Sequence, residues 1–151
     1  MSMRIGYGYD VHRLAEGEEL CLGGIKIPHT KGTVAHSDGD VLLHAICDAI
    51  LGAAAMRDIG YHFPDNQEDY KNIDSKILLK KTVELIAEKG YTIINIDSTV
   101  CLEKPKLKDY IPAMIQSIAK QVSSSSENVS VKATTTEKLG FVGKEEGISA
   151  H

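Results

Sequence analysis

The sequence contains no tryptophan and few aromatic residues of any kind, which make up 5% of its 151 residues. Any core must therefore be built from isoleucine, leucine, valine and alanine side chains. The chain has no long basic run and a net charge of −4, so nucleic acid is not expected as a partner. No apolar run reaches the roughly 18 residues that a membrane span needs. The first residues lack the pattern of a signal peptide, and we expect a cytoplasmic protein.

Cysteine is also scarce, with Cys21, Cys47 and Cys101 lying far apart in the sequence. An odd number without C-x-x-C spacing argues against a disulfide framework or a cysteine-only zinc site. All three lie among apolar residues, so we expect them to be small buried core residues. The composition is balanced, with 42% hydrophobic and 25% charged residues, and we assign residues 1–151 to a single domain.

The hydrophobic pattern predicts an α+β fold, with a mixed sheet of four to five strands and helices packed on one face. We expect helices from the capping residues Ser37 and Asp38 to Gly60, from Ser75 to Lys89, and from Lys106 to Val122, with Pro112 in a first turn or at a bend. A loop should reach His36, and residues 61–73 should be irregular. Strands are expected over residues 3–12, 20–28, 91–103, 128–136 and 148–151, the last apparently cut short.

The first candidate site is the pair Asp10 and His12, because side chains two residues apart on a strand point to the same face. His44 lies one turn after Asp40 in the predicted helix. Aspartate and histidine suit Zn²⁺ or a similar divalent ion, and three protein ligands leave a fourth position open, as catalytic zinc sites require. Spacing alone favours the alternative, which is an ion pair at a strand end with His44 as a hydrogen-bonded core histidine.

A second candidate is the segment Ala35–Asp40, which places His36 and Ser37 before the start of the long helix. Free backbone N–H groups at a helix start favour anions such as phosphate. The neighbouring carboxylates Asp38 and Asp40 repel anions unless a metal intervenes. Helix capping by these polar residues is the simpler alternative.

Two further segments carry polar groups that suit a phosphorylated, hydroxylated substrate. Thr134, Thr135 and Thr136 are followed at once by Glu137, and hydroxyls beside a carboxylate suit a phosphate–Mg²⁺ site. The threonines are equally explained as strand-forming residues. Asp58 and Asp65 flank the irregular loop, where they either face water or hold the hydroxyls of a polyol.

Several segments together closely resemble the 2-C-methyl-D-erythritol 2,4-cyclodiphosphate synthase family. They include "RIGYGYDVHRL", "VAHSDGDVLLHAICDAILGAAAMRDIGYHFPD" and "VSVKATTTEKLGFVGKEEGI", and the match runs in order along essentially the whole chain. The resemblance implies a phosphorus–oxygen lyase of the non-mevalonate isoprenoid pathway. Such an enzyme converts 4-diphosphocytidyl-2-C-methyl-D-erythritol 2-phosphate into the cyclic diphosphate and releases CMP.

The same resemblance implies roles for individual residues. Zn²⁺ would be bound by Asp10, His12 and His44, and Mg²⁺ or Mn²⁺ by Glu137 together with the substrate phosphates. The catalytic residues would be His36, Asp58, Thr135 and Glu137. Substrate would be bound by Ser37, Gly60, Phe63, Asp65, Pro105, Lys106, Leu107, Ala133, Thr134, Phe141 and Lys144, with Pro105–Leu107 and Ala133–Thr135 lining the cytidine pocket.

The resemblance further implies a homotrimer, with sheets around the threefold axis and an active site at each subunit interface. An isoprenoid diphosphate would fit the central channel, where Lys144 stands in place of the usual arginine and binds phosphate as a point charge. Family members continue through a further strand-like segment beyond "GISAH". The rival functions are a metal-dependent phosphohydrolase and a metal-stabilised trimeric module that binds isoprenoid diphosphates without turnover.

Overall fold

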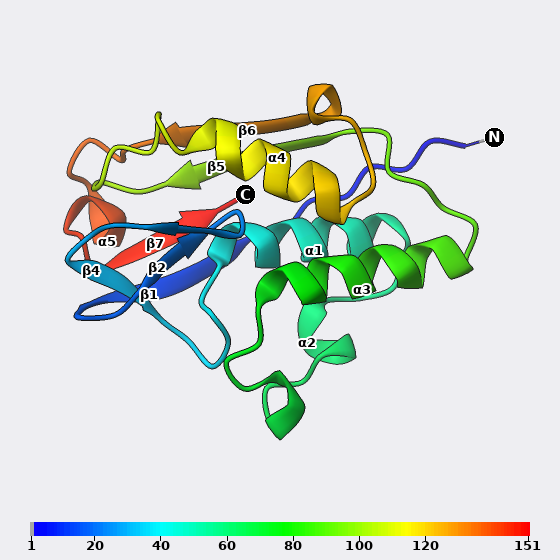
Figure 1. Ribbon diagram of the computed structural model, residues 1–151, viewed down its shortest axis with the longest axis horizontal. Helices are drawn as coiled ribbons and strands as arrows, with labels where there is room; N and C mark the ends of the chain where they lie inside the picture. Colours follow the sequence, from blue (N-terminus) through cyan, green and yellow to red (C-terminus); the bar gives the residue numbers. More distant parts are fainter. Residues whose placement is uncertain (1) are drawn as a thin grey trace.

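A computed structural model describes residues 2–151, which form a five-stranded mixed sheet, a two-stranded hairpin and a set of helices (Figure 1). The large sheet has the order β4-β1-β7-β5-β6, and only β5 and β6 run parallel. The strands are β1 (Asp10–Glu16), β4 (Lys31–Val34), β5 (Ile96–Cys101), β6 (Val129–Thr134) and β7 (Gly147–Ala150), and the hairpin is β2 (Leu20–Leu22) with β3 (Ile25–Ile27). The predicted α+β fold with a mixed sheet is confirmed.

The helices pack on the sheet and on one another. α1 (Val41–Ala53) contacts β1, β7 and β5, α4 (Ile111–Gln121) contacts β6, and α3 (Ser75–Glu88) contacts both α1 and α4. The short helices are α2 (Ile59–His62) and α5 (Gly140–Gly143), with single 3₁₀ turns at Glu68–Tyr70 and Ser126–Asn128. No helix in residues 2–151 is both long and apolar enough to cross a membrane.

The core lies between the large sheet and the helices α1, α3 and α4, and consists mainly of leucine, isoleucine and valine side chains. On α1, Leu42, Leu43 and Cys47 are fully buried because they recur at the spacing of one helical face. Cys21 is also buried, whereas Cys101 is half-buried, so the core prediction holds for two cysteines and in part for the third.

The first strand begins later than predicted, at Asp10 instead of residue 3. Residues 2–9 are extended but pair with no strand, because their backbone lies directly against α1. A Cβ atom on Gly8 would stand 1.8 Å from the carbonyl oxygen of Ala45, and one on Gly6 would stand 1.8 Å from that of Ala49. Glycine at these two positions allows the close approach.

The predicted strand over residues 20–28 is in fact the hairpin of β2 and β3. Gly23 and Gly24 have positive φ values of 60° and 78°, which turn the chain back on itself. The expected loop up to His36 contains β4, which pairs with β1 at the edge of the sheet. The predicted strand over 91–103 is shorter, as β5, and the one over 128–136 is β6.

Helix boundaries differ from the prediction for local reasons. α1 starts at Val41, because its cap is the Asp40 carboxylate and not Ser37 or Asp38. It ends at Ala53, well before Gly60. α4 starts at Ile111, which places Pro112 in the first turn, where a missing N–H is tolerated.

The helix predicted from Ser75 to Lys89 is confirmed as α3. The segment 61–73, expected to be irregular, contains the end of α2 and one 3₁₀ turn. The last strand lies in the middle of the large sheet as β7, paired with β1 on one side and β5 on the other.

Candidate metal centre

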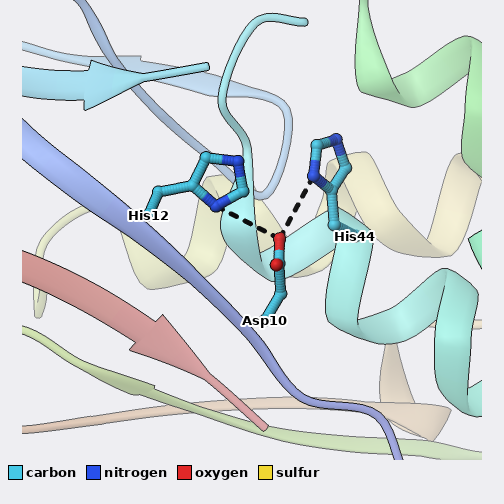
Figure 2. A group of neighbouring side chains, drawn as sticks. All are labelled: Asp10, His12 and His44. Carbon is cyan, nitrogen blue, oxygen red and sulfur yellow. Dashed lines mark hydrogen bonds and ion pairs between the residues drawn. The ribbon is translucent and has the colours of Figure 1, made fainter. Parts of the chain in front are cut away.

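Asp10, His12 and His44 come together where the start of β1 meets the first turn of α1 (Figure 2). Asp10 and His12 share the helix-facing side of β1, as their spacing predicted. His44 is brought in by α1, which packs on β1. Among residues 2–151, this is the group of histidine, cysteine, aspartate and glutamate side chains whose geometry suits a metal ion.

The ligand atoms of the three residues converge, and all lie within 4.8 Å of one another. The Asp10 Oδ2 atom is 3.2 Å from Nδ1 of His12 and 3.2 Å from Nδ1 of His44. Figure 2 shows both imidazole rings turned toward the carboxylate. One oxygen and two nitrogen ligands, with room for a fourth, is the donor set of a catalytic zinc-type site.

The hydrogen-bonding state of His12 supports a metal at this position. Its Nδ1 atom is buried and makes no hydrogen bond, although it lies 3.2 Å from Asp10 Oδ2. A buried polar atom without a partner costs free energy, so native proteins rarely leave one unsatisfied. A divalent ion among the three side chains would engage this nitrogen, and the residues therefore fit a metal.

The charge of the site also favours a bound cation. Burial raises the pKa of Asp10, but the two neighbouring imidazoles outweigh it and lower that pKa to about 2. Asp10 is therefore ionised at neutral pH. Burial lowers the pKa of His44, yet the hydrogen bond and charge of Asp10 raise it overall. A metal that binds here displaces a proton from this imidazole.

The other ring nitrogen of His44 is held by a chain of hydrogen bonds. Nε2 lies 2.8 Å from the hydroxyl of Ser75, the first residue of α3, and 3.3 Å from that of Ser37. The Ser75 hydroxyl donates to the Asp38 carboxylate, which also accepts the Ser75 backbone N–H at 2.8 Å. No local signal in the sequence marks Ser75 as a site residue, and Asp38 is predicted only as a helix cap. The hydrogen bonds between them join the loop before α1 to the start of α3, 37 residues further on.

Asp40, one turn before His44, is a fully buried carboxylate that organises the start of α1. It accepts the backbone N–H groups of Leu43 and Gly23 at 3.0 Å and that of Gly24 at 2.7 Å. These bonds tie the turn of the β2–β3 hairpin to the helix that carries His44. Burial raises the pKa of Asp40 to about 6 despite the backbone hydrogen bonds.

The predicted polyol-binding residues lie around α2, which follows α1. Asp58 is exposed and caps α2 by accepting the Tyr61 N–H at 2.9 Å. Asp48, one turn after His44, accepts the Ile59 N–H at 2.7 Å and so anchors the start of α2 to α1. Gly60 and Asp65 are exposed, and Phe63 is buried.

His36 and Ser37 lie in the bend between β4 and α1. His36 is exposed, and its backbone oxygen accepts the Asn72 N–H at 2.8 Å. Ser37 is half-buried and faces His44. Ser37 therefore lies next to the metal-type cluster, and His36 directly precedes it in the chain.

Most of the remaining predicted residues lie at or after β5 and β6, away from the cluster, whereas Phe141 lies beside Gly147, next to the backbone of His12. One row of paired residues crosses β1, β7, β5 and β6 and consists of Asp10, Ala150, Val100 and Ala133. Ala133 is therefore three strands, or roughly 14 Å, from Asp10. Glu137 is exposed in the loop after β6 and is not among the clustered ligand atoms. Among the other predicted substrate-binding residues, Leu107 is buried. The rest are partly or fully exposed, namely Pro105, Lys106, Thr134, Thr135, Phe141 and Lys144.

The sheet, the helices on it and the converging trio define an α+β protein with a divalent-metal-type centre. The chain belongs to the YgbB family, whose model matches residues 3–151. A Bacteroides fragilis protein named 2-C-methyl-D-erythritol 2,4-cyclodiphosphate synthase is 66% identical over all of this chain and 95% of its own. The protein of that name from Bacteroides thetaiotaomicron is 65% identical with the same coverage.

Solved structures of similar proteins have the same fold. A CDP-bound 2C-methyl-D-erythritol-2,4-cyclodiphosphate synthase superposes with a TM-score of 0.90 at 33% identity, covering 97% of this chain and 95% of that one. The Plasmodium falciparum IspF–CDP complex gives 0.84 at 38% identity, covering 97% and 90%. The bifunctional IspDF of Campylobacter jejuni gives 0.93 at 47% identity, and this chain spans only 40% of that longer protein.

Proposed function

We propose that the chain converts 4-diphosphocytidyl-2-C-methyl-D-erythritol 2-phosphate into 2-C-methyl-D-erythritol 2,4-cyclodiphosphate, with release of CMP. The observation that carries this function is the 66% identity to a synthase of that name over the full chain, together with the convergence of Asp10, His12 and His44. We assign the reaction to the non-mevalonate isoprenoid pathway, and the similarity to named synthases supports an enzyme of this kind.

The reaction requires one phosphate to approach another. The 2-phosphate of the substrate attacks the β-phosphate, the bond to the α-phosphate oxygen breaks, and CMP leaves with that oxygen. The nucleophile is already an anion, so no protein nucleophile is needed. The protein instead has to hold two anionic groups in line and offset their repulsion.

We assign the trio as the ligands of Zn²⁺, which would act as a Lewis acid and a template for the diphosphate. The Glu137 carboxylate would bind Mg²⁺ or Mn²⁺ with the substrate phosphates, since Mg²⁺ usually takes only one or two protein carboxylates. His36 and Ser37 would contact phosphate beside His44. Asp58, on the exposed start of α2, would hold the erythritol hydroxyls.

The cytidine pocket would be formed by Pro105–Leu107 and Ala133–Thr135. Because Ala133 lies three strands, or about 14 Å, from Asp10, one chain alone does not surround a compact substrate. We therefore propose that the cytidine group of one subunit faces the metal centre of its neighbour in a homotrimer. Lys144, exposed at the end of α5, would face an isoprenoid diphosphate in the central channel.

Exposed apolar side chains support an assembly. Ile5, Tyr7, Tyr9 and Val11 alternate with the residues that face α1, and Ile5 and Tyr7 are 87% and 72% exposed. A row of large apolar side chains of this kind marks an interaction surface in a monomer. Sedimentation equilibrium tests the trimer, and a monomer at micromolar concentration would contradict it.

The function is tested by incubating the cytidyl substrate with the protein and following the products by phosphorus NMR. We expect a cyclic diphosphate and CMP, and loss of both when a chelator is added. Inorganic phosphate or a linear product would instead indicate a phosphohydrolase. Tight binding of isoprenoid diphosphate without turnover would indicate a binding module.

Variants connect this activity to the trio. Asp10→Ala and His44→Ala should lose both bound zinc and CMP release. Asp97→Ala is a matched control, because Asp97 is an exposed carboxylate that pairs with Lys132 at the surface. Full metal content and turnover in His44→Ala would refute the zinc assignment.

A further inference from the structure

We propose that Ser75 and Asp38 are positioning residues that fix the tautomer and orientation of His44 for metal binding. This inference rests on the proposed metal centre at Asp10, His12 and His44. Neither residue contacts the open side of that cluster. Both act through the ring nitrogen that points away from it.

The direction of each hydrogen bond follows from the Asp38 carboxylate. An ionised carboxylate only accepts, so the Ser75 hydroxyl must donate its hydrogen to Asp38 Oδ1. With that hydrogen used, the Ser75 oxygen can only accept from His44 Nε2, which lies 2.8 Å away. Nε2 of His44 therefore carries a hydrogen. Nδ1, the other ring nitrogen, lies 3.2 Å from Asp10 Oδ2, so a metal bound at the cluster would take the lone pair of Nδ1 in place of its proton while Nε2 keeps its hydrogen.

The Asp38 carboxylate is itself firmly held. Its Oδ2 accepts the Ser75 backbone N–H at 2.8 Å, and its Oδ1 accepts the Asp40 backbone N–H at 3.1 Å. These bonds connect the loop before α1 to the first residue of α3. Ser75 is fully buried, so water does not compete for its hydroxyl.

Ser37 provides only a weaker second acceptor for His44. Its hydroxyl lies 3.3 Å from Nε2 and also accepts the Gly39 N–H at 3.3 Å. The shorter contact to Ser75 is the stronger one, because hydrogen bonds weaken beyond about 3.2 Å. Ser75 is thus the dominant partner. Outer partners of a metal-binding histidine typically contribute about 10–100-fold to metal affinity.

The first test measures the tautomer of His44 in the unaltered protein loaded with Zn²⁺. ¹⁵N NMR should show a hydrogen on Nε2 and none on Nδ1, which would bind the metal. A hydrogen on Nδ1 would overturn the proposal without any variant. This measurement also stands if a variant fails to fold.

The second test measures Co²⁺ binding by its visible absorption spectrum. Ser75→Ala removes the acceptor but keeps the backbone N–H that bonds to Asp38, so the start of α3 should be retained. We expect about 10–100-fold weaker Co²⁺ binding. Asp38→Asn should also weaken binding, because its amide can donate to Ser75 and turn the hydroxyl toward His44, which favours the opposite tautomer.

The matched control is Ser98→Ala, which removes a buried hydroxyl on β5, two strands away from β1, that donates to the Ser130 carbonyl at 2.9 Å. It should bind Co²⁺ as the unaltered protein does. Wild-type affinity in both Ser75→Ala and Asp38→Asn would overturn the positioning role and leave the metal centre intact. Failure of the unaltered protein to bind Co²⁺ would overturn both the metal centre and this inference.

Discussion

The Asp40 carboxylate offers a sharp test of how the start of α1 is organised. It is fully buried, with no cationic side chain bonded to it, and only three backbone N–H groups offset its charge. Burial raises its pKa from the ordinary 3.8 to about 6. Because the folded chain binds this proton more tightly, the group contributes stability below pH ~4, and that contribution is lost as the pH rises through ~6.

The size of the effect follows from the two pKa values. A difference of about 2 corresponds to roughly 3 kcal/mol of unfolding free energy. Asp40→Asn removes the titration. Its amide oxygen can keep the bonds to Gly23 and Leu43, while its NH₂ group meets the Gly24 N–H. Between pH 4 and pH 7, the unfolding free energy of the variant should therefore rise by about 3 kcal/mol relative to that of the unaltered chain. This relative rise does not depend on how stable the variant is at pH 4.

Urea unfolding at pH 4, 5, 6 and 7 measures this difference. Protein concentration is held fixed and a chelator is present, since assembly and metal binding also shift apparent stability. Asp97→Asn is the control, because the hydrogen bond from Lys132 lowers the pKa of Asp97 below its ordinary 3.8, so this group titrates below the measured range and its effect on unfolding should stay nearly constant from pH 4 to pH 7. A constant offset between Asp40→Asn and the unaltered chain at every pH would refute the reasoning.

Three further predictions concern the site. Gly8→Ala should strongly destabilise the protein in thermal unfolding, because the new Cβ would stand 1.8 Å from the Ala45 carbonyl oxygen, and an unchanged midpoint would contradict this packing. Glu137→Ala should abolish turnover while zinc content, measured by atomic absorption, stays at the wild-type level; intact Mg²⁺ dependence would exclude its role. Zinc binding followed by calorimetry should weaken as pH falls through the raised pKa of His44, because the proton competes with the metal, whereas Asp10, with a pKa of about 2, stays ionised.

Much of the site could be predicted from local sequence. Asp10 and His12 had to share a face because alternate residues of a strand do so, and His44 had to lie near the start of a helix that Asp40 precedes. That α1 packs His44 against Asp10 could not be derived from spacing, since it depends on the contact between β1 and α1. The motif resemblance supplied that pairing, and the convergence of their ligand atoms agrees with it.

Other parts of the site depended on contacts distant in sequence. Asp38 read as a helix cap because capping is local, but its partner is Ser75, 37 residues further on. The apolar pattern of residues 20–28 predicts one strand, because nothing local shows that Gly23 and Gly24 adopt positive φ values in a turn that is bonded to Asp40.

The sequence by itself determined the α+β class, the α3 helix, the family and the three metal-type ligands, because these follow from periodicity and from motifs that are local in the chain. The tertiary structure alone decided where β1 begins, the central place of β7 and the bonds behind His44. These depend on close backbone packing against α1, on strand pairing, and on hydrogen bonds between segments that no local pattern connects.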